Sequence, residues 1–326
     1  MAFLVAAAAI GIFGSLIAMI GWQIYRRRAS NPERAFGDFI DGRLPEVVEP
    51  SPEQLADLRA ALHGLALPAV VLEADLAAPI GPGGTRIGGP VWLADGTEWP
   101  LGKDGRPLEF VAQLDFAAMP PLPDYPEAGL LQLFIGRDDD YGMDYQHPDQ
   151  GNFRLLWHGG GLHGGRMVPP PLLPKYGSPE DEGYSATPYM RDSVREQGVA
   201  LVARPERRLP ENYCWPQEQL MQQLGIDARA QSAWDVVEAV FKGNNSVHHV
   251  GGHPAFTQSD YRLDRAFPPH DDPQPSPYRD YDRVLFQLTS DNGLQWGDMG
   301  EANVMIRRED LLARRFDRAV WWWDCH

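Results

Sequence analysis

Residues 87–135 contain three landmarks, Ile87-Gly88-Gly89-Pro90, Phe110-Val111-Ala112-Gln113-Leu114-Asp115 and Gly129-Leu130-Leu131-Gln132-Leu133-Phe134-Ile135. They return in the same order as Val250-Gly251-Gly252-His253-Pro254, Val284-Leu285-Phe286-Gln287-Leu288-Thr289 and Gly300-Glu301-Ala302-Asn303-Val304-Met305-Ile306. The copies lie about 160 to 175 residues apart, which is too long for a solenoid repeat and suits a duplicated half-domain. We therefore expect two related halves, at about residues 85–150 and 245–326.

Each copy carries strand patterns. In residues 110–116 apolar side chains alternate with Val111, Gln113 and Asp115, which predicts a strand with one apolar face. Residues 130–135 are apolar on both sides, so this strand should lie deep in a sheet. The three tryptophans of residues 321–323 predict a final strand. Two copies of such strand pairs favour a mainly antiparallel α+β fold.

Three further segments have local signatures. Ser51-Pro52-Glu53-Gln54 predicts a helix start with Ser51 as N-cap and Gln54 completing a capping box. Apolar residues at helical spacing predict a second helix over residues 234–242, which Gly243 should end. Residues 159–183 are rich in Gly and Pro and should form a long surface excursion.

Charge and cysteine content exclude some classes of protein. The chain has 45 acidic and 29 basic residues and a formal charge of -16, which would repel a phosphate backbone, so nucleic acid is not expected as a partner. Its two cysteines, Cys214 and Cys325, lie far apart in a long chain and indicate no disulfide framework. A length of 326 residues suits either two domains or one domain of two related halves.

The N-terminus predicts a membrane anchor. Residues 2–25 carry no charged side chain and are long enough, as a helix, to cross a hydrocarbon core of about 30 Å. A cleaved signal peptide would need a positive n-region, which this sequence lacks. Arg26-Arg27-Arg28 follows the segment, so the positive-inside tendency places the remaining chain in the cytoplasm. We expect a transmembrane helix and basic flank at 1–28, a flexible tether at 29–50 and an α+β domain at 51–326.

Small residues recur on one side of the predicted membrane helix. Ala7, Gly11 and Ser15 are spaced by four residues, which would let two helices approach closely and form a homodimer. The alternative is that such residues are simply common in membrane helices.

Several phrases together resemble one known family. They are Ile87-Gly88-Gly89-Pro90, Glu98-Trp99-Pro100, Ala112-Gln113-Leu114-Asp115, Gly129–Ile135, Asp138–Gly142, Val250–Gln258, Leu285–Leu288, Trp296-Gly297-Asp298 with Gly300, and Val320–Cys325. The sequence from about residue 70 to 326 is similar to the YwqG-like family, domain of unknown function 1963. The resemblance implies a bacterial α+β protein and supplies no catalytic residues. The predicted anchor and the Gly/Pro-rich excursion depart from it, so localisation is not carried over.

A histidine cluster surrounds the second Gly-Gly pair. His248 and His249 would point to opposite faces of a strand, so only one of them could join His253 around a metal. Our candidate pair is His249 and His253. A catalytic metal needs about three protein ligands. The third could come from the residues Asp291, Asp298, His158 or His163. The alternative is that these histidines only form hydrogen bonds near strand ends.

The segment Asp138-Asp139-Asp140-Tyr141-Gly142-Met143-Asp144 has oxygens at alternate positions and a glycine in the turn, as calcium loops do. It lacks their glutamate at the twelfth position, where Asp149 stands. An acidic turn between two strands is therefore the favoured interpretation.

Paired amides suggest a binding site. Gln113 and Gln287 hold equivalent places in the two copies, as do Gln132 and Asn303. If the halves meet across a pseudo-two-fold axis, these amides could line a ligand cleft at the seam, with Trp99, Trp296 and Asp298 as further lining. The alternative is that each amide satisfies backbone groups at a strand end or bulge.

Nucleophilic motifs are absent from the sequence. It has no Gly-x-Ser-x-Gly and no His-Glu-x-x-His, and adjacent Cys325 and His326 would point to opposite faces of a strand. We therefore expect a non-catalytic binding or interaction protein at the inner membrane, without a cofactor, that recognises a protein or small ligand at the seam. A metal-assisted hydrolase using His248, His249 and His253 is the alternative.

Overall fold

The fold is taken from a computed structural model of the chain, which describes residues 46–172, 186–210, 216–242, 245–258, 260–262 and 276–326. The chain divides into two compact units. One contains residues 46–64 with Pro216–Lys242, and the other contains Leu65–Trp215 with Gly243–His326. The predicted anchor, its small-residue stripe and most of the predicted tether lie outside the described residues. Within the described part of the chain, no helix has the length and apolar character needed to cross a membrane.

The first unit is helical. Its helices are α3 (Pro52–Gly64), α5 (Pro216–Gln223) and α6 (Gln231–Phe241). The predicted capping box is confirmed, because Gln54 N donates to Ser51 Oγ and Ser51 N donates to Gln54 Oε1. Helix α6 begins three residues before the predicted start. No side chain caps this start, and the Gln231 side chain donates to Asp235 one turn later.

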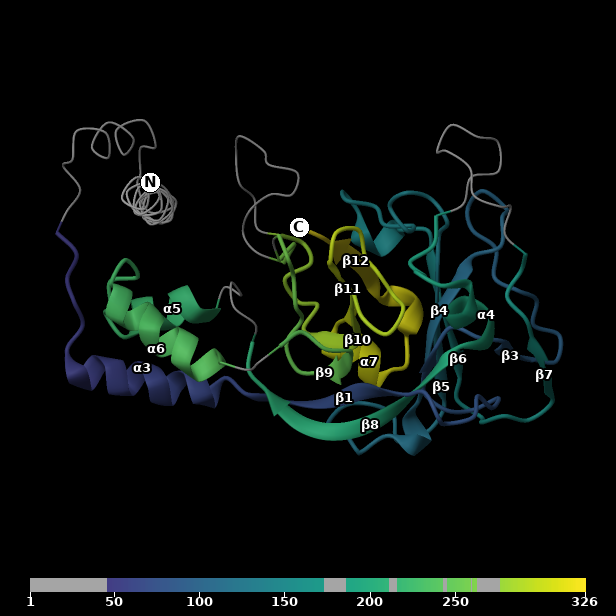
Figure 1. The fold of residues 1–326 in the computed structure, drawn as a ribbon, viewed down its shortest axis with the longest axis horizontal. Coiled ribbons are helices and arrows are strands. Elements are labelled where there is room, and N and C mark those ends of the chain that lie inside the picture. The colour runs from purple at the N-terminus through teal and green to yellow at the C-terminus, as the bar shows by residue number, and fades with distance from the viewer. Residues whose placement is uncertain (1–45, 173–185, 211–215, 243–244, 259, 263–275) are drawn as a thin grey trace, which may run out of the picture. The chain divides into compact units, whose positions relative to one another are not determined.

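The second unit contains all the strands and the shorter helices. The strands are β1 (Leu67–Asp75), β2 (Arg86–Ile87), β3 (Val91–Ala94), β4 (Glu109–Asp115), β5 (Leu130–Ile135), β6 (Phe153–His158), β7 (Gly165–Val168), β8 (Val199–Arg208), β9 (His249–Gly251), β10 (Arg283–Thr289), β11 (Glu301–Ile306) and β12 (Val320–Asp324). The helices are α4 (Asp192–Gln197) and α7 (Arg308–Leu312), with 3₁₀ turns at Phe116–Ala118, Pro148–Gln150 and Phe316–Arg318. Figure 1 shows their arrangement.

Ten strands form one antiparallel sheet in the order β12-β11-β10-β9-β1-β8-β2-β4-β5-β6. The long pair β1–β8 lies in the middle and curves beneath both halves (Figure 1). The first half contributes β2, β4, β5 and β6 on one side of this pair, and the second half contributes β9 to β12 on the other. The mainly antiparallel α+β fold that the sequence predicts is therefore confirmed.

The two halves share local geometry. The ladder of β4 with β5 shifts register between Phe110 and Ala112, and that of β10 with β11 shifts between Val284 and Phe286. Each Gly-Gly pair follows a short strand and has positive φ at both residues. These similarities are those that a duplication would leave, and a common origin of the halves stays a prediction.

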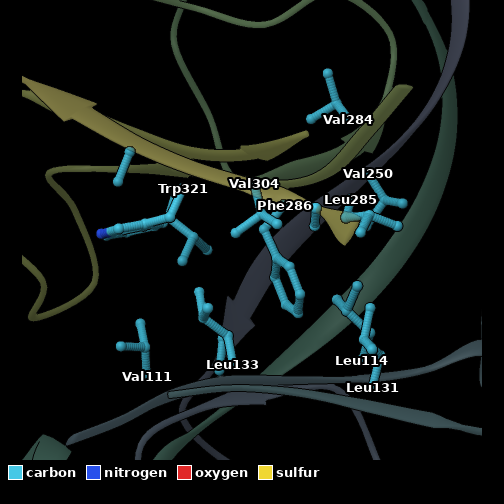
Figure 2. Packing of buried hydrophobic residues seen from close by; sticks show 14 of the residues in the cluster. Val111, Leu114, Leu131, Leu133, Val250, Val284, Leu285, Phe286, Val304 and Trp321 are labelled. Atoms are coloured by element: carbon cyan, nitrogen blue, oxygen red, sulfur yellow. The ribbon is translucent and has the colours of Figure 1, made fainter. Parts of the chain in front are cut away.

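The halves pack through one hydrophobic core. Figure 2 shows Leu114 and Leu133 of the first half pointing toward Phe286 and Trp321 of the second. The strand at 109–115 differs from its prediction, because Val111 and Gln113 are as fully buried as its apolar face. Val111 lies in the same core as Leu114, because the ladder shifts register between Phe110 and Ala112, and Gln113 is covered by the loop at 82–84.

The predicted surface excursion is partly regular. Residues 165–168 form β7, which pairs with β3 in a two-stranded sheet. A Cβ at Gly165 would lie 2.5 Å from the Trp92 ring, so glycine there permits the close approach. Residues 173–183 of the excursion lie outside the described residues.

Candidate functional site

A cleft with a volume of about 370 Å³ opens between the segment around α4 and the loop that joins β10 to β11. Its lining comes from three segments: the turn after β1, residues 190–199 around α4, and residues 290–299 between β10 and β11. The lining residues are Leu76, Met190, Arg191, Val194, Val199, Ser290, Asp291, Asn292, Gly293, Leu294, Gln295 and Met299. We call this the seam cleft.

Backbone hydrogen bonds join two walls of the seam cleft. Met190 N donates to Gly293 O at 3.0 Å, and Gln295 N donates to Pro188 O at 2.8 Å. Between them Tyr189 and Leu294 form an isolated antiparallel bridge. This short ladder fixes the segment before α4 against the loop 290–299, so the cleft has a defined floor.

Glycine at position 293 is required by the close approach of α4. Its φ is +93°, and a Cβ there would lie 2.6 Å from Val194 Cγ2. The preceding Asn292 also has a positive φ. Asn-Gly is a strong turn signal, so this dipeptide could have pointed to the loop from sequence alone.

Helix α4 is held from below by the first half. Gly89 N donates to Arg195 O at 3.0 Å, and Gly88 faces Val194 O so closely that a Cβ would lie 2.3 Å away. Arg195 Nε donates to Glu109 Oε1 at 2.8 Å. The first Gly-Gly pair therefore serves to seat the helix that forms one cleft wall.

Glu109 is the centre of a buried ionic cluster beneath α4. It is fully buried and contacts both Arg195 and Arg137, whose Nε lies 3.1 Å from Glu109 Oε2. Burial raises the pKa of Glu109, and the two arginines act in the opposite direction. Arg137 Nη2 finds no acceptor among the described residues. One carboxylate thus contacts two buried guanidinium groups.

Three apolar side chains are exposed at the opening of the seam cleft. Leu76 is 86% exposed, Met190 is 64% exposed and Met299 is 58% exposed. The floor beneath them consists of buried Val194, Val199 and Leu294. Exposed apolar side chains gathered around a hollow are typical of binding surfaces, whereas single exposed ones need no explanation.

Gln113, a predicted site residue, belongs to a buried amide network of the first half. Its Nε2 donates to Gly84 O at 2.9 Å, and its Oε1 accepts from Gln132 Nε2 at 2.9 Å. Gln132 Oε1 in turn lies 3.1 Å from His158 Nε2. Partial burial lowers the pKa of His158, so its neutral ring donates to this oxygen near pH 7.

Gln287, the second predicted amide, has partners only in its own half as well. Its Oε1 accepts from Ala255 N at 3.0 Å, and its Nε2 donates to Glu301 Oε2 at 2.9 Å. Thr289 Oγ1 also donates to Glu301, at 2.8 Å, and Ser246 Oγ is a further donor. Burial raises the pKa of Glu301, which these donors oppose.

The structure does not bring Gln113 and Gln287 together at the seam. Four strands separate β4 from β10 in the sheet. Because neighbouring strand residues point to opposite faces, these amides point away from the core that Leu114 and Phe286 share. Their contacts are those of the alternative interpretation, in which each amide satisfies backbone and side-chain groups locally.

The remaining predicted lining residues lie in different places. Trp99 packs edge-on against Phe134 and donates from Nε1 to Leu108 O at 2.9 Å. Trp296 belongs to the loop 290–299 but is fully buried behind the seam cleft. Asp298 is exposed on the same loop, next to Met299. Of the predicted lining residues, Trp296 and Asp298 therefore lie on the loop 290–299, but none of the three lines the seam cleft.

Each of the three histidines forms its own hydrogen bond with the backbone. His249 Nδ1 donates to Gly251 O at 2.9 Å, and His253 Nε2 donates to Leu65 O at 2.7 Å. His248 Nδ1 accepts from Thr289 N at 3.1 Å. Burial lowers the pKa of His248 to about 4 and that of His249 to about 3, so both are neutral at pH 7. Among the described residues no three His, Cys, Asp or Glu side chains are grouped to hold a metal.

The acidic segment 138–144 forms turns that join the halves. Asp138 Oδ1 accepts from Gly142 N at 2.7 Å, and Asp144 Oδ1 accepts from Gln146 N at 2.9 Å. The backbone of this segment also binds the last strand of the second half, because Trp321 Nε1 donates to Tyr141 O at 3.0 Å. These contacts agree with the favoured interpretation of an acidic turn.

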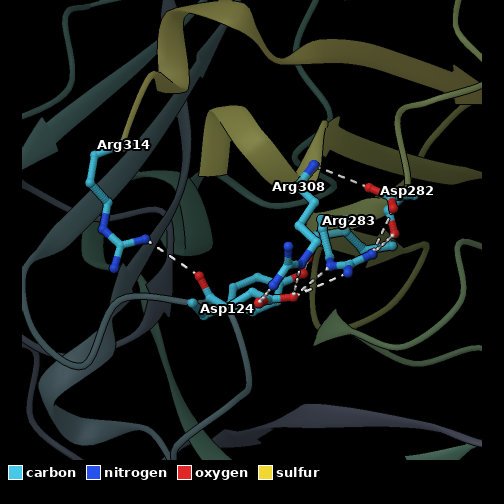
Figure 3. Close-up of polar contacts among 7 residues, drawn as sticks. Asp124, Asp282, Arg283, Arg308 and Arg314 are labelled. Atoms are coloured by element: carbon cyan, nitrogen blue, oxygen red, sulfur yellow. Dashed lines mark hydrogen bonds and ion pairs between the residues drawn. The ribbon is translucent and has the colours of Figure 1, made fainter. Parts of the chain in front are cut away.

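A second connection between the halves centres on Asp124. Figure 3 shows its carboxylate between Arg283 and Arg308, with its backbone oxygen accepting from Arg314. Arg308 and Arg283 lower the pKa of Asp124, so the carboxylate is ionised at neutral pH. Asp124 has a φ of +74°, an uncommon conformation that this set of arginines stabilises. We interpret the cluster as structural, because its charged groups pair with one another.

The described strands form an antiparallel α+β domain with a cleft between the α4 segment and the loop 290–299. A family model described as a domain of unknown function, DUF1963, matches residues 85–325, and the chain belongs to this family. No curated protein matches the chain significantly.

Proposed function

We propose that this protein is a membrane-anchored interaction protein that holds an apolar segment of a partner, or a small apolar ligand, in the seam cleft. One observation carries the proposal: three separate segments of the chain form one cleft, and its opening exposes Leu76, Met190 and Met299. Methionine side chains are flexible and polarizable, so they adapt to varied apolar partners. The contacts of the histidines give no comparable support to a metal-assisted hydrolase.

The methionine methyl groups allow a direct test. We expect a neutral, water-soluble peptide with a central Leu-Met-Leu to shift the methyl NMR signals of Met190 and Met299 in the full-length chain along one binding curve. Met190→Asp should weaken this binding about tenfold, because roughly 1.4 kcal/mol of apolar burial is replaced by a charge at the rim.

Met167 provides the matched control, because it is 37% exposed on β7 and does not line the seam cleft. Its methyl signal should stay unchanged during the titration, and Met167→Asp should bind the peptide as the parent chain does. Equal shifts of all exposed methionines, or no shift of Met190 and Met299, would contradict the proposal.

We further propose that residues 2–25 anchor the chain in the inner membrane, with the described units in the cytoplasm. The support comes from the uncharged segment and the following Arg26-Arg27-Arg28. A close contact of two anchors through Ala7, Gly11 and Ser15 is part of the same proposal.

Fractionation tests the anchor. The full-length chain should stay with membranes after an alkaline carbonate wash, and the chain without residues 2–25 should appear in the supernatant. Added protease should digest the domain in inverted vesicles but not in intact spheroplasts, because only the former expose the cytoplasmic face. Extraction of the full-length chain by carbonate would rule out a spanning helix.

A further inference from the structure

The charges around the seam cleft are predominantly acidic and unpaired. Two exposed charged residues, Arg191 and Asp291, belong to the lining itself. Asp75, Asp192 and Asp298 each adjoin a lining residue in the chain. Arg195 also adjoins a lining residue but is paired with Glu109, so the four carboxylates and one guanidinium outside that pair give a net charge of -3.

None of these four aspartates forms an ion pair with a described arginine or lysine. Asp75 accepts from Ala77 N at 2.9 Å and Asp291 from Asn292 N at 2.6 Å, contacts that leave both negative charges unneutralised. Asp124, Asp260 and Asp310, by contrast, are each paired with a neighbouring arginine. The cleft rim is therefore a place where negative charge is left available.

An apolar hollow inside an acidic rim selects one kind of occupant. We propose that the seam cleft binds a basic amphipathic peptide segment of a partner protein, with apolar side chains in the hollow and flanking Lys or Arg opposite the rim aspartates. This inference rests on the proposed function and names the partner's chemistry. The net charge of -16 on the whole chain would also steer a basic partner toward it and repel an acidic one.

Three matched peptides test the inference on the full-length chain. Each has the same central Leu-Met-Leu, and the flanking residues are all Lys, all Ser or all Glu. The Lys peptide should bind at least about tenfold more tightly than the Glu peptide at low salt, as three or four exposed charge pairs allow. The difference should shrink at high salt because exposed charges are screened.

Charge variants locate the effect. Asp192→Asn with Asp298→Asn, both outside the cleft lining, should reduce the preference for the Lys peptide severalfold and leave binding of the Ser peptide unchanged. The control pair Asp57→Asn with Asp139→Asn removes the same charge from exposed positions outside the cleft lining and should keep the preference.

The outcomes separate the two proposals. Equal binding of all three peptides, abolished by Met190→Asp, would overturn the basic-partner inference and keep the seam cleft as a binding site. A preference for the Lys peptide that both pairs of variants reduce equally would also overturn it, because the charge effect would then be global. Failure of every peptide to bind would overturn the proposed function itself.

Discussion

Replacing Glu109 with glutamine should lower the free energy of unfolding by about 3 to 5 kcal/mol, which is the usual effect of removing one partner from a buried ion pair. Glu109 is fully buried between Arg137 and Arg195, whose side chains are 7% and 6% exposed. Glutamine preserves the shape but removes the only carboxylate that contacts both arginines. Two guanidinium groups would then stay buried without a counter-charge, and urea unfolding should show a lower midpoint at an unchanged slope.

Asp104 provides the matched comparison for Glu109. It pairs with Arg106, and both side chains are largely solvent-accessible, at 40% and 51% exposure. Because exposed pairs contribute about 0 to 1 kcal/mol, Asp104→Asn should change stability little. If Glu109→Gln cost no more than Asp104→Asn, the buried cluster would not be a major source of stability.

The Glu109 cluster also connects stability with the candidate site. Arg195 belongs to α4, and its neighbour Val194 lies in the floor of the seam cleft. The carboxylate on β4 therefore positions a cleft wall from the opposite side of the helix. We infer that the first half supplies the rigid base of the site, while the exposed side chains of its rim supply adaptability.

Much of the fold was predictable because its signals are local. The strand at 130–135 was placed correctly, since a short run that is apolar except for Gln132, with a preceding glycine, is typical of a buried strand. The capping box at Ser51 was equally local. The central pair β1–β8 was not predicted as a pair, because the partners are more than a hundred residues apart and charged residues in β8 obscure its alternation.

The candidate site was less predictable than the fold. Gln113 and Gln287 hold similar ladder positions, opposite Gln132 and Asn303, but sequence alone could not show that each points away from the shared core. That orientation depends on which face of each half is covered by the other half. The cleft is instead formed by irregular segments, where Asn292-Gly293 was the only strong local signal.

Gly142→Ala should destabilise the protein by about 2 to 5 kcal/mol, through backbone strain and overpacking together. Gly142 has a φ of +76°, and a Cβ there would lie 2.3 Å from Asn152 O and 2.5 Å from Gly136 N. Both obstacles are backbone atoms next to β5 and β6, so neither can rotate away. Relief would require the turn 138–144 to move.

Movement of that turn should also disrupt the connection between the halves. Trp323 Nε1 donates to Asp140 O at 2.7 Å, and Trp323 N donates to Met143 Sδ at 3.3 Å. We therefore expect Gly142→Ala to change the near-UV circular dichroism of the buried tryptophans, as well as to lower the urea midpoint.

Gly96→Ala separates strain from steric conflict. Gly96 has a φ of +80°, and a Cβ there would meet nothing within 4 Å. Alanine at this position should cost only about 1 to 2 kcal/mol, from the left-handed backbone alone, and leave the near-UV spectrum unchanged. Equal losses in the two variants would mean that backbone conformation, rather than the packing of residues 138–144 against the last strand, sets the requirement for glycine. A larger loss in Gly142→Ala, accompanied by the spectral change, would identify this turn as a structural connection between the two halves.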